Sequence, residues 1–206
     1  MVAADGAFGD VGALPDGSGL VALQATMISP PRPVRISDGQ VVALPFPGLS
    51  DADIAVPGTA ARLTATAADG TPVESWLILP PGASAATPAP LVTFIHGGPV
   101  GSWITWHWRW NPHLLAERGY AVLLPDPGIS TGYGQAFVDR GWGRWGEEPY
   151  TDLMTAVDAS GKNLVWMGLP AADVAGARPW WKIQGGTTLT RGEVMLGAEV
   201  AARLDK

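Results

Sequence analysis

Two continuous apolar runs, separated by a short helical pattern, constrain the fold of this chain more than any other feature. The runs are Leu91 to Ile95 and Ala121 to Leu124, and neither alternates with polar residues. Strands that are buried on both faces of a mainly parallel sheet have this character. Pro112 to Arg118, between the runs, is typical of a helix, which Gly119 ends. The order strand, helix, strand therefore predicts an α/β domain, which we expect to begin near Gly58.

The chain before Gly58 is predicted to form short antiparallel strands. Leu20 to Thr26, Val34 to Ile36 and Val41 to Leu44 are apolar runs separated by Pro, Asp, Ser and Gly residues. Such turn residues join strands in tight hairpins. We interpret residues 1–57 as a short antiparallel β segment, either a single sheet or a β-propeller blade, followed by a Pro- and Gly-rich linker.

Three further patterns organise the rest of the chain. Asp69-Gly70 lies between two apolar runs and predicts a β-hairpin, because both residues tolerate positive φ. Tyr150 to Ala159 is predicted to be a helix with polar and acidic residues near its N-terminus. We assign residues 58–160 to the first part of an α/β domain. Residues 161–206 have scattered glycines and no sustained period, so we treat them as a tail.

Composition limits the partners of the chain. A formal net charge of -6 argues against nucleic-acid binding, which relies on clustered Lys and Arg. With no cysteine, the chain has no disulfide, thiol nucleophile or thiolate ligand. The first ten residues lack the basic and apolar regions of a secretory signal, and no apolar run approaches the roughly 20 residues that span a bilayer. We therefore expect a cytoplasmic chain with no nucleic-acid partner and no membrane span.

The first apolar run leads directly into His96-Gly97-Gly98-Pro99. Two glycines after a buried strand can present backbone N–H groups to a cleft, which is the geometry of an oxyanion hole. We therefore predict that Gly97 and Gly98 form an oxyanion-hole scaffold at the carboxyl end of a central strand. His96 is predicted to orient this loop by hydrogen bonding.

Residues 128–132, G-I-S-T-G, match the G-x-S-x-G pattern of a nucleophile elbow. All three histidines precede Ser130, however, whereas the triad of an α/β-hydrolase runs in the order serine, acid, histidine. A serine without a base is a weak nucleophile near neutral pH. We therefore interpret Ser130 as a turn serine and predict no catalytic residue in the chain. A base donated to Ser130 by another subunit is the alternative.

Other candidate residues carry weaker signals. Ser102 lacks the second glycine of an elbow, and Gly185-Gly186-Thr187 lacks both that glycine and a following base. His96, His107 and His113 are not spaced to place two ligands on one helical face. No metal site and no cofactor are predicted.

Tryptophan is concentrated just after the glycine pair, at Trp103, Trp106, Trp108 and Trp110. Alternation at the last three positions would place three indoles on one side of an extended segment. Trp103 and Trp106 in particular are expected either to line an apolar substrate pocket or to belong to a lid packed on the core. The sequence leaves both interpretations open.

Several segments, taken in order, resemble the hydrolase domain of the prolyl oligopeptidase family of serine peptidases, in its dipeptidyl-peptidase and acylaminoacyl-peptidase branch. They are P-L-V-T-F-I-H-G-G-P (90–99), R-G-Y-A-V-L-L-P-D-P (118–127), S-T-G-Y-G (130–134), and G-W-G-R-W-G followed by P-Y-T-D-L (141–153). The resemblance implies an α/β-hydrolase fold and cleavage of short peptides through an acyl-enzyme. It also implies that Gly97 and Gly98 help form the oxyanion hole and that Ser130 is structural.

The chain departs from the family pattern in two places. Many relatives have Arg-Gly before S-T-G-Y-G, where this chain has Gly128-Ile129. After Asp158 the family continues to a strand, a G-x-S-x-G-G elbow and, later, the acid and the base, and none of these follows here. The resemblance therefore implies that this chain is a fragment of a serine peptidase and that the fragment is inactive as given. Peptides are the substrates that the resemblance implies for the intact family.

Two further expectations remain. The alternative to a peptidase fragment is a non-catalytic peptide- or protein-binding module that keeps the Trp-lined cleft. In addition, a sheet cut after its first strands leaves an unpaired edge, and exposed edges promote association. We therefore expect the chain to self-associate.

Overall fold

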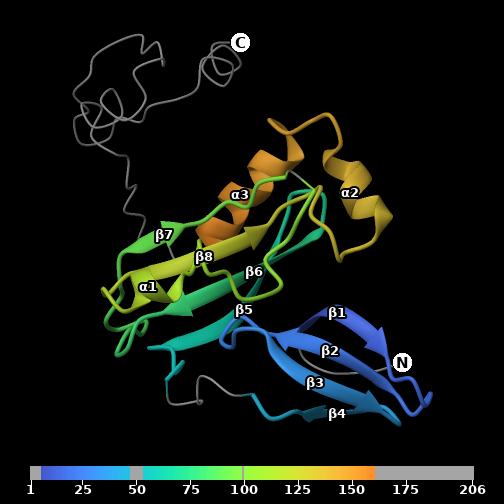
Figure 1. The fold of residues 1–206 in the computed structure, drawn as a ribbon. Helices are drawn as coiled ribbons and strands as arrows, with labels where there is room; N and C mark the ends of the chain where they lie inside the picture. The colour runs from blue at the N-terminus through green and yellow to red at the C-terminus, as the bar shows by residue number, and fades with distance from the viewer. Residues whose placement is uncertain (1–5, 47–52, 99, 161–206) are drawn as a thin grey trace, which may run out of the picture. The chain divides into compact units, whose positions relative to one another are not determined.

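The computed structural model describes residues 6–46, 53–98 and 100–160, which form two four-stranded sheets and three helices (Figure 1). The predicted tail at residues 161–206, which includes Thr187, lies outside the described residues. No helix within the described ranges is long and apolar enough to span a membrane.

The first sheet, sheet A, is an antiparallel meander whose strands pair in chain order: β1 (Ala7–Ala13), β2 (Leu20–Ala25), β3 (Arg32–Ser37) and β4 (Gln40–Ala43). The last three confirm the strands predicted from the apolar runs. The pattern does not predict β1, whose Gly9 and Gly12 flank a register shift against β2 and interrupt any alternation.

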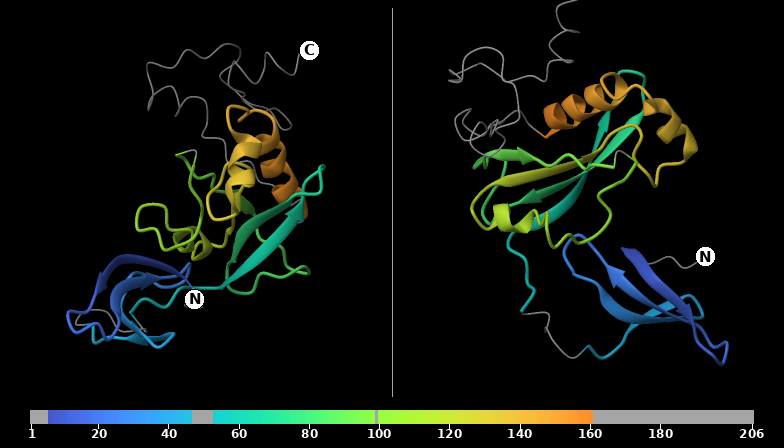
Figure 2. Two further views of the ribbon diagram at one scale, coloured as in Figure 1. Left: turned by 90° about the vertical axis from the view of Figure 1, so that its right-hand side faces the viewer. Right: turned by 45° about the horizontal axis from the view of Figure 1, so that its top comes forward.

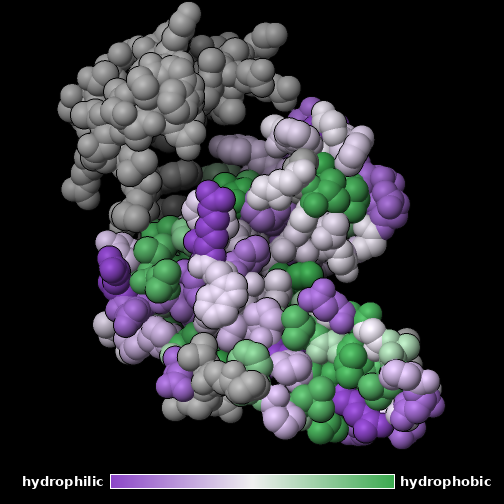
Figure 3. Space-filling model, viewed as in Figure 1, coloured by the Kyte–Doolittle hydropathy of each residue, from purple (hydrophilic) through white to green (hydrophobic). Residues whose placement is uncertain are grey.

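Sheet A is held by a tight turn and a small core. Asp38 and Gly39 connect β3 to β4 with φ angles of 51° and 75°, as a primed hairpin turn requires. Its buried core consists of Ala22, Val34 and Ile36. Apolar patches remain on the surface over this sheet (Figure 3), and the exposed side chains include those of Val11 and Val42.

The second sheet, sheet B, has the order β5-β6-β8-β7. Its strands are β5 (Thr59–Thr66), β6 (Pro72–Leu79), β7 (Leu91–Thr93) and β8 (Ala121–Asp126). The β5–β6 hairpin turns at Asp69-Gly70, as predicted, and the Gly70 amide donates to the Ala67 carbonyl at 2.9 Å.

Sheet B is not mainly parallel within the described residues, contrary to the prediction. Only β7 and β8 run parallel; β5 with β6 and β6 with β8 are antiparallel. The β5–β6 connection is a tight hairpin, which can join only antiparallel strands, whereas parallel strands such as β7 and β8 need a long crossover. Every residue of β8 is buried, which confirms the burial inferred from its apolar run.

Three helices accompany sheet B: α1 (His113–Ala116), α2 (Gln135–Gly141) and α3 (Glu148–Ala159). Leu123 of β8 packs in a cluster with Ala156 of α3, whereas Val122 packs with Ala116 of α1. Because neighbouring strand residues point to opposite faces, α1 and α3 cover opposite faces of the sheet, as the two views in Figure 2 show. The sequence predicted α1 longer, and α3 two residues shorter, than observed.

Strand β7 is the outer strand of sheet B in the described part of the chain. The Phe94 amide donates to the Leu123 carbonyl on β8 at 2.9 Å. Because successive residues point their N–H groups to opposite edges, Thr93 and Ile95 direct theirs away from β8. The H-G-G-P segment thus follows an outer strand, not the central strand that we predicted.

Replacing Ile95 with lysine is expected to reduce self-association. Ile95 is 61% exposed beside the outer edge of β7, and a lysine there would bring like charges together when two edges approach. Sedimentation velocity at matched concentrations measures the effect. The control is Ile28→Lys, at an isoleucine that is 52% exposed after β2. An unchanged distribution, or the same change in both variants, would contradict pairing through this edge.

Candidate functional site

The loop that follows β7 and contains Gly97 and Gly98, called the glycine loop below, borders a pocket of about 440 Å³. Its wall includes Gly97 and the His96 side chain on the β7 side and the Trp103 indole beyond the loop. Gly98 has a φ of 126°, in the region that favours glycine, and lies outside the lining residues. The structure therefore places one of the two predicted oxyanion-hole glycines at a cleft.

His96 and Ser130 meet although they are 34 residues apart in the chain. The His96 Nε2 atom lies 2.9 Å from Ser130 Oγ, and the Ser130 hydroxyl donates to the Pro127 carbonyl oxygen at 2.6 Å. A hydroxyl has one proton, so with that proton on Pro127 the imidazole must be the donor in the contact with Ser130. The loop-orienting role predicted for His96 therefore has a definite partner.

The same hydrogen bonds argue against Ser130 as a nucleophile. A catalytic base accepts the serine proton, whereas here the imidazole donates and the proton points to a carbonyl. Ser130 is completely buried, while an elbow serine exposes its oxygen. In addition, the strained positive φ of 83° belongs to Ile129, one residue earlier. The G-x-S-x-G match is a buried turn.

A buried carboxylate, Asp126, lies at the end of β8 beside this pair. Asp126 Oδ1 accepts from the Trp103 amide at 2.8 Å, Oδ2 accepts from the Tyr133 hydroxyl at 2.6 Å, and Oδ1 lies 3.6 Å from His96 Nε2. Burial raises the pKa of Asp126, and these hydrogen bonds partly oppose that shift. Burial and the contact with Asp126 also raise the pKa of Tyr133. Sequence reasoning missed both residues, although a charged residue closing an apolar run was a usable signal.

The tryptophans separate into different environments. Trp103 is buried and lines the pocket, and Trp110 lines it while remaining largely exposed. Trp106 does not line this pocket; its ring stacks on His113, with centroids 5.8 Å apart. The segment thus combines both interpretations, since Trp103 and Trp110 border a cleft and Trp106 packs beside α1.

The other candidates have structural contacts. His107 meets the Trp103 ring edge to face at 5.2 Å, and Ser102 Oγ lies 3.1 Å from Thr131 Oγ1. His113 is buried with Nε2 2.8 Å from the Met27 carbonyl oxygen, and burial lowers its pKa. Among the residues that the structure describes, no cluster of histidine or acidic side chains could hold a metal ion.

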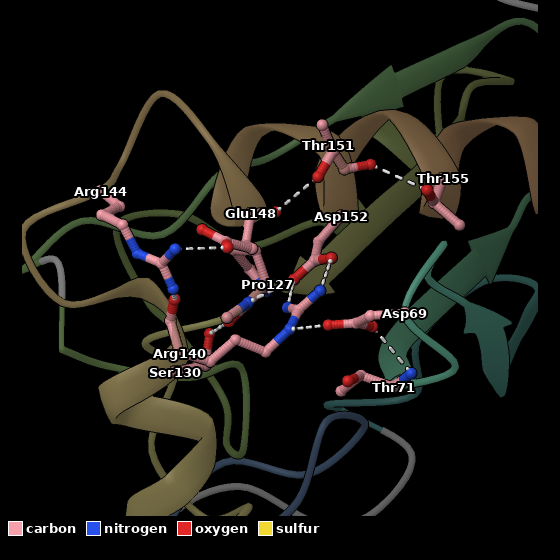
Figure 4. Close-up of polar contacts among 11 residues, drawn as sticks. Asp69, Thr71, Pro127, Ser130, Arg140, Arg144, Glu148, Thr151, Asp152 and Thr155 are labelled. Atoms are coloured by element: carbon pink, nitrogen blue, oxygen red, sulfur yellow. Dashed lines mark hydrogen bonds and ion pairs between the residues drawn. The ribbon is translucent and has the colours of Figure 1, made fainter.

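An ion-pair clasp under the site joins α2, α3 and the β5–β6 turn (Figure 4). Arg140 of α2 binds both carboxylate oxygens of the buried Asp152 of α3, and its Nε donates to Asp69 at 2.8 Å. Asp152 Oδ2 also accepts from the Gly128 amide at 2.8 Å. Hydrogen bonding to Arg140 lowers the pKa of Asp69. The clasp therefore holds the turn that carries Ser130, and no sequence motif predicts it.

Gly128 has no room for a side chain. A Cβ on Gly128 would lie 2.9 Å from Arg140 Nη1 and 3.1 Å from Asp152 Oδ2. The guanidinium of Arg140 thus occupies the space beside position 128. The next residue, Ile129, has a positive φ of 83°, a backbone conformation that favours glycine.

Comparison with known proteins agrees with the geometry. The profile of the Prolyl oligopeptidase family matches residues 106–169, which extends past residue 160, where we ended the family-like segment. Dipeptidyl-peptidase 5 from Aspergillus fumigatus is 40% identical over 108 residues, covering 52% of this chain and 15% of the relative. Probable dipeptidyl-peptidase 5 from Emericella nidulans is 39% identical over 112 residues, covering 54% and 16%. The chain thus spans about a sixth of the length of these relatives.

Solved structures share the fold. A Pyrococcus horikoshii acylaminoacyl peptidase superposes with a TM-score of 0.64 at 22% identity, covering 76% of this chain and 24% of that one. A Mycobacterium tuberculosis puromycin-hydrolyzing peptidase gives a TM-score of 0.58 at 26% identity, covering 75% and 24%. These likenesses, the family profile and the order of the motifs agree. Over the segment that these comparisons match, the chain is therefore similar to proteins of the prolyl oligopeptidase family.

Proposed function

We propose that the chain is part of a peptidase that hydrolyses short peptides through an acyl-enzyme, and that it is inactive as given because nucleophile, acid and base are missing. The observation that carries the proposal is Gly97 on the wall of a pocket, directly after a strand parallel to β8. Acyl transfer needs N–H donors where negative charge develops on the carbonyl oxygen, and glycine lets the backbone approach that oxygen closely.

The chemistry requires more than this scaffold. A tetrahedral intermediate forms only when a nucleophile attacks the carbonyl carbon, and its proton must pass to a base. Ser130 is completely buried, and its hydroxyl donates to the Pro127 carbonyl oxygen instead of to a base, so it is not placed as a nucleophile. The described residues thus provide the surroundings of an acyl-transfer site without its reacting groups.

We expect the chain to remain unlabelled by a fluorophosphonate probe and to release nothing from aminoacyl or dipeptidyl chromogenic substrates. An active serine hydrolase in the same reaction controls for the probe, and Ser130→Ala should behave like the unchanged chain. Stoichiometric labelling that Ser130→Ala abolishes would overturn both the inactivity and the structural interpretation of Ser130.

The DNA around the gene tests whether the chain derives from a longer peptidase. A neighbouring reading frame that encodes G-x-S-x-G-G after codon 158 would support the proposal of a peptidase fragment.

The second candidate is a peptide-binding module without catalysis. It is favoured by the same pocket, where Trp103, His107 and Trp110 provide an aromatic wall. Measurable affinity for apolar peptides together with no turnover would support it, and no affinity in a folded chain would exclude it.

Sheet A fits the proposed origin of residues 1–57 in a β-propeller. A blade is a four-stranded antiparallel meander, which is the order β1-β2-β3-β4. Blades pack face to face, and Val42 is an exposed apolar residue on the face opposite the buried Val34 and Ile36, which suits a face that a neighbouring blade would cover.

A further inference from the structure

The glycine loop is held to β6, to β8 and to the turn after β8 at several points. Its described residues are 96–98 and 100–103, beyond the end of β7. The Thr131 amide donates to the Gly101 carbonyl at 2.9 Å, and the Trp76 indole donates to the Trp103 carbonyl at 2.9 Å. These contacts hold the far half of the loop.

One buried carboxylate contacts both ends of this loop. Asp126 Oδ1 accepts the Trp103 amide at 2.8 Å at one end, and the same oxygen lies 3.6 Å from His96 Nε2 at the other. His96 donates to Ser130 Oγ at 2.9 Å, which keeps the imidazole beside the carboxylate. Because the carboxylate lies beside the His96 imidazole, the neighbouring Gly97 on the pocket wall is held near the end of β8.

The position of Asp126 is itself held. Tyr133 donates to Oδ2 at 2.6 Å, so both carboxylate oxygens are engaged, and the side chain is completely buried. Burying a charge is unfavourable unless hydrogen bonds compensate, and here the compensating donors are the loop amide and a tyrosine next to the turn. The carboxylate therefore anchors the loop to the end of β8.

We propose that Asp126 is the positioning residue of the glycine loop: it acts through Trp103 and His96 to set the path of the Gly97 amide at the pocket. This inference rests on the proposed function for its catalytic meaning. Its test, however, measures loop order without turnover, so a negative result would leave the proposed function standing, and an inactive pocket would leave this inference standing.

Residue-resolved amide exchange on the full chain, by NMR or mass spectrometry, tests the proposal. In Asp126→Ala, exchange at Trp103 should rise about tenfold or more relative to Ile78 in β6, because the hydrogen bond from the Trp103 amide to a buried carboxylate is lost. Asp126→Asn keeps an acceptor oxygen and should restore the protection of Trp103. A general loss of packing would not be rescued in this way.

Asp69→Ala is the control, since Asp69 is also a carboxylate that accepts a backbone amide, that of Thr71 at 2.9 Å, but its side chain is 48% exposed. It should raise exchange at Thr71 and leave the ratio of Trp103 to Ile78 exchange within about twofold. An unchanged ratio in Asp126→Ala, or a folded Asp126→Asn with an unprotected Trp103, would overturn the proposal. If neither variant folds, the unchanged chain decides, because rapid exchange at Trp103 there contradicts an anchored loop.

Discussion

Replacing Asp152 with alanine is expected to destabilise the chain by about 3–5 kcal/mol, since removing one member of a buried ion pair leaves Arg140 with only the half-exposed Asp69 as its partner. Asp152 is fully buried, and its partner Arg140 is 13% exposed. The same change removes the acceptor of the Gly128 amide. Because small domains have a free energy of unfolding of about 5–15 kcal/mol, the loss should shift the urea midpoint sharply or abolish the cooperative transition.

Arg144→Ala provides the control for this clasp. Arg144 pairs with Glu148 at 2.8 Å, but both side chains are partly exposed, at 48% and 27%. Exposed ion pairs contribute about 0–1 kcal/mol, so this variant should unfold close to the unchanged chain. Equal midpoints for Asp152→Ala and Arg144→Ala would show that the clasp does not stabilise the domain.

Leu123→Ala is the second change with a large expected effect. Leu123 lies in the middle of β8, completely buried, in a cluster with Leu91, Ala156 and Val157. Shortening a fully buried leucine costs about 2–5 kcal/mol, since apolar contacts are lost and a cavity remains between sheet and helix. Denaturation followed by circular dichroism measures the change in the free energy of unfolding.

A leucine on the surface provides the comparison for this core change. Leu114 of α1 is 58% exposed, so Leu114→Ala should alter stability by less than about 0.5 kcal/mol. If Leu123→Ala were equally mild, sheet B and α3 would not form one packed core.

The elements that could be predicted have local causes. Asp69-Gly70 predicts a hairpin because the conformation of the turn depends on these two residues. The apolar run beginning at Ala121 predicts a buried strand because burial on both faces removes the alternation of apolar and polar residues. Features whose cause is not local could not be predicted. Strand β1 contains glycines at a register shift, and the strand directions in sheet B depend on connections and not on strand composition.

The site shows the same division. The glycine loop after β7 and the position of Gly97 at a cleft could be predicted, because a strand end followed by glycines is a local pattern, whereas Gly98 does not line the cleft. Trp106 could not be assigned from its spacing, since its stacking on His113 depends on how the loop returns to α1. The absence of a histidine after Ser130 favours a structural serine and can be seen in the sequence. The contact between Ser130 and His96 could not be predicted, because it joins residues far apart in the chain.

The sequence by itself determined the strand and helix types, the hairpin turn, the glycine loop and the family resemblance, because each depends on neighbouring residues or on their order. Only the tertiary structure decided that His96 lies beside Ser130, that Asp126 contacts both ends of the loop, and that Arg140 joins Asp69 to Asp152. These contacts join residues far apart in the chain. They exist because the parallel register of β7 on β8 brings two strand ends to the same edge, where the loops that follow must share one buried space and satisfy one another's polar groups.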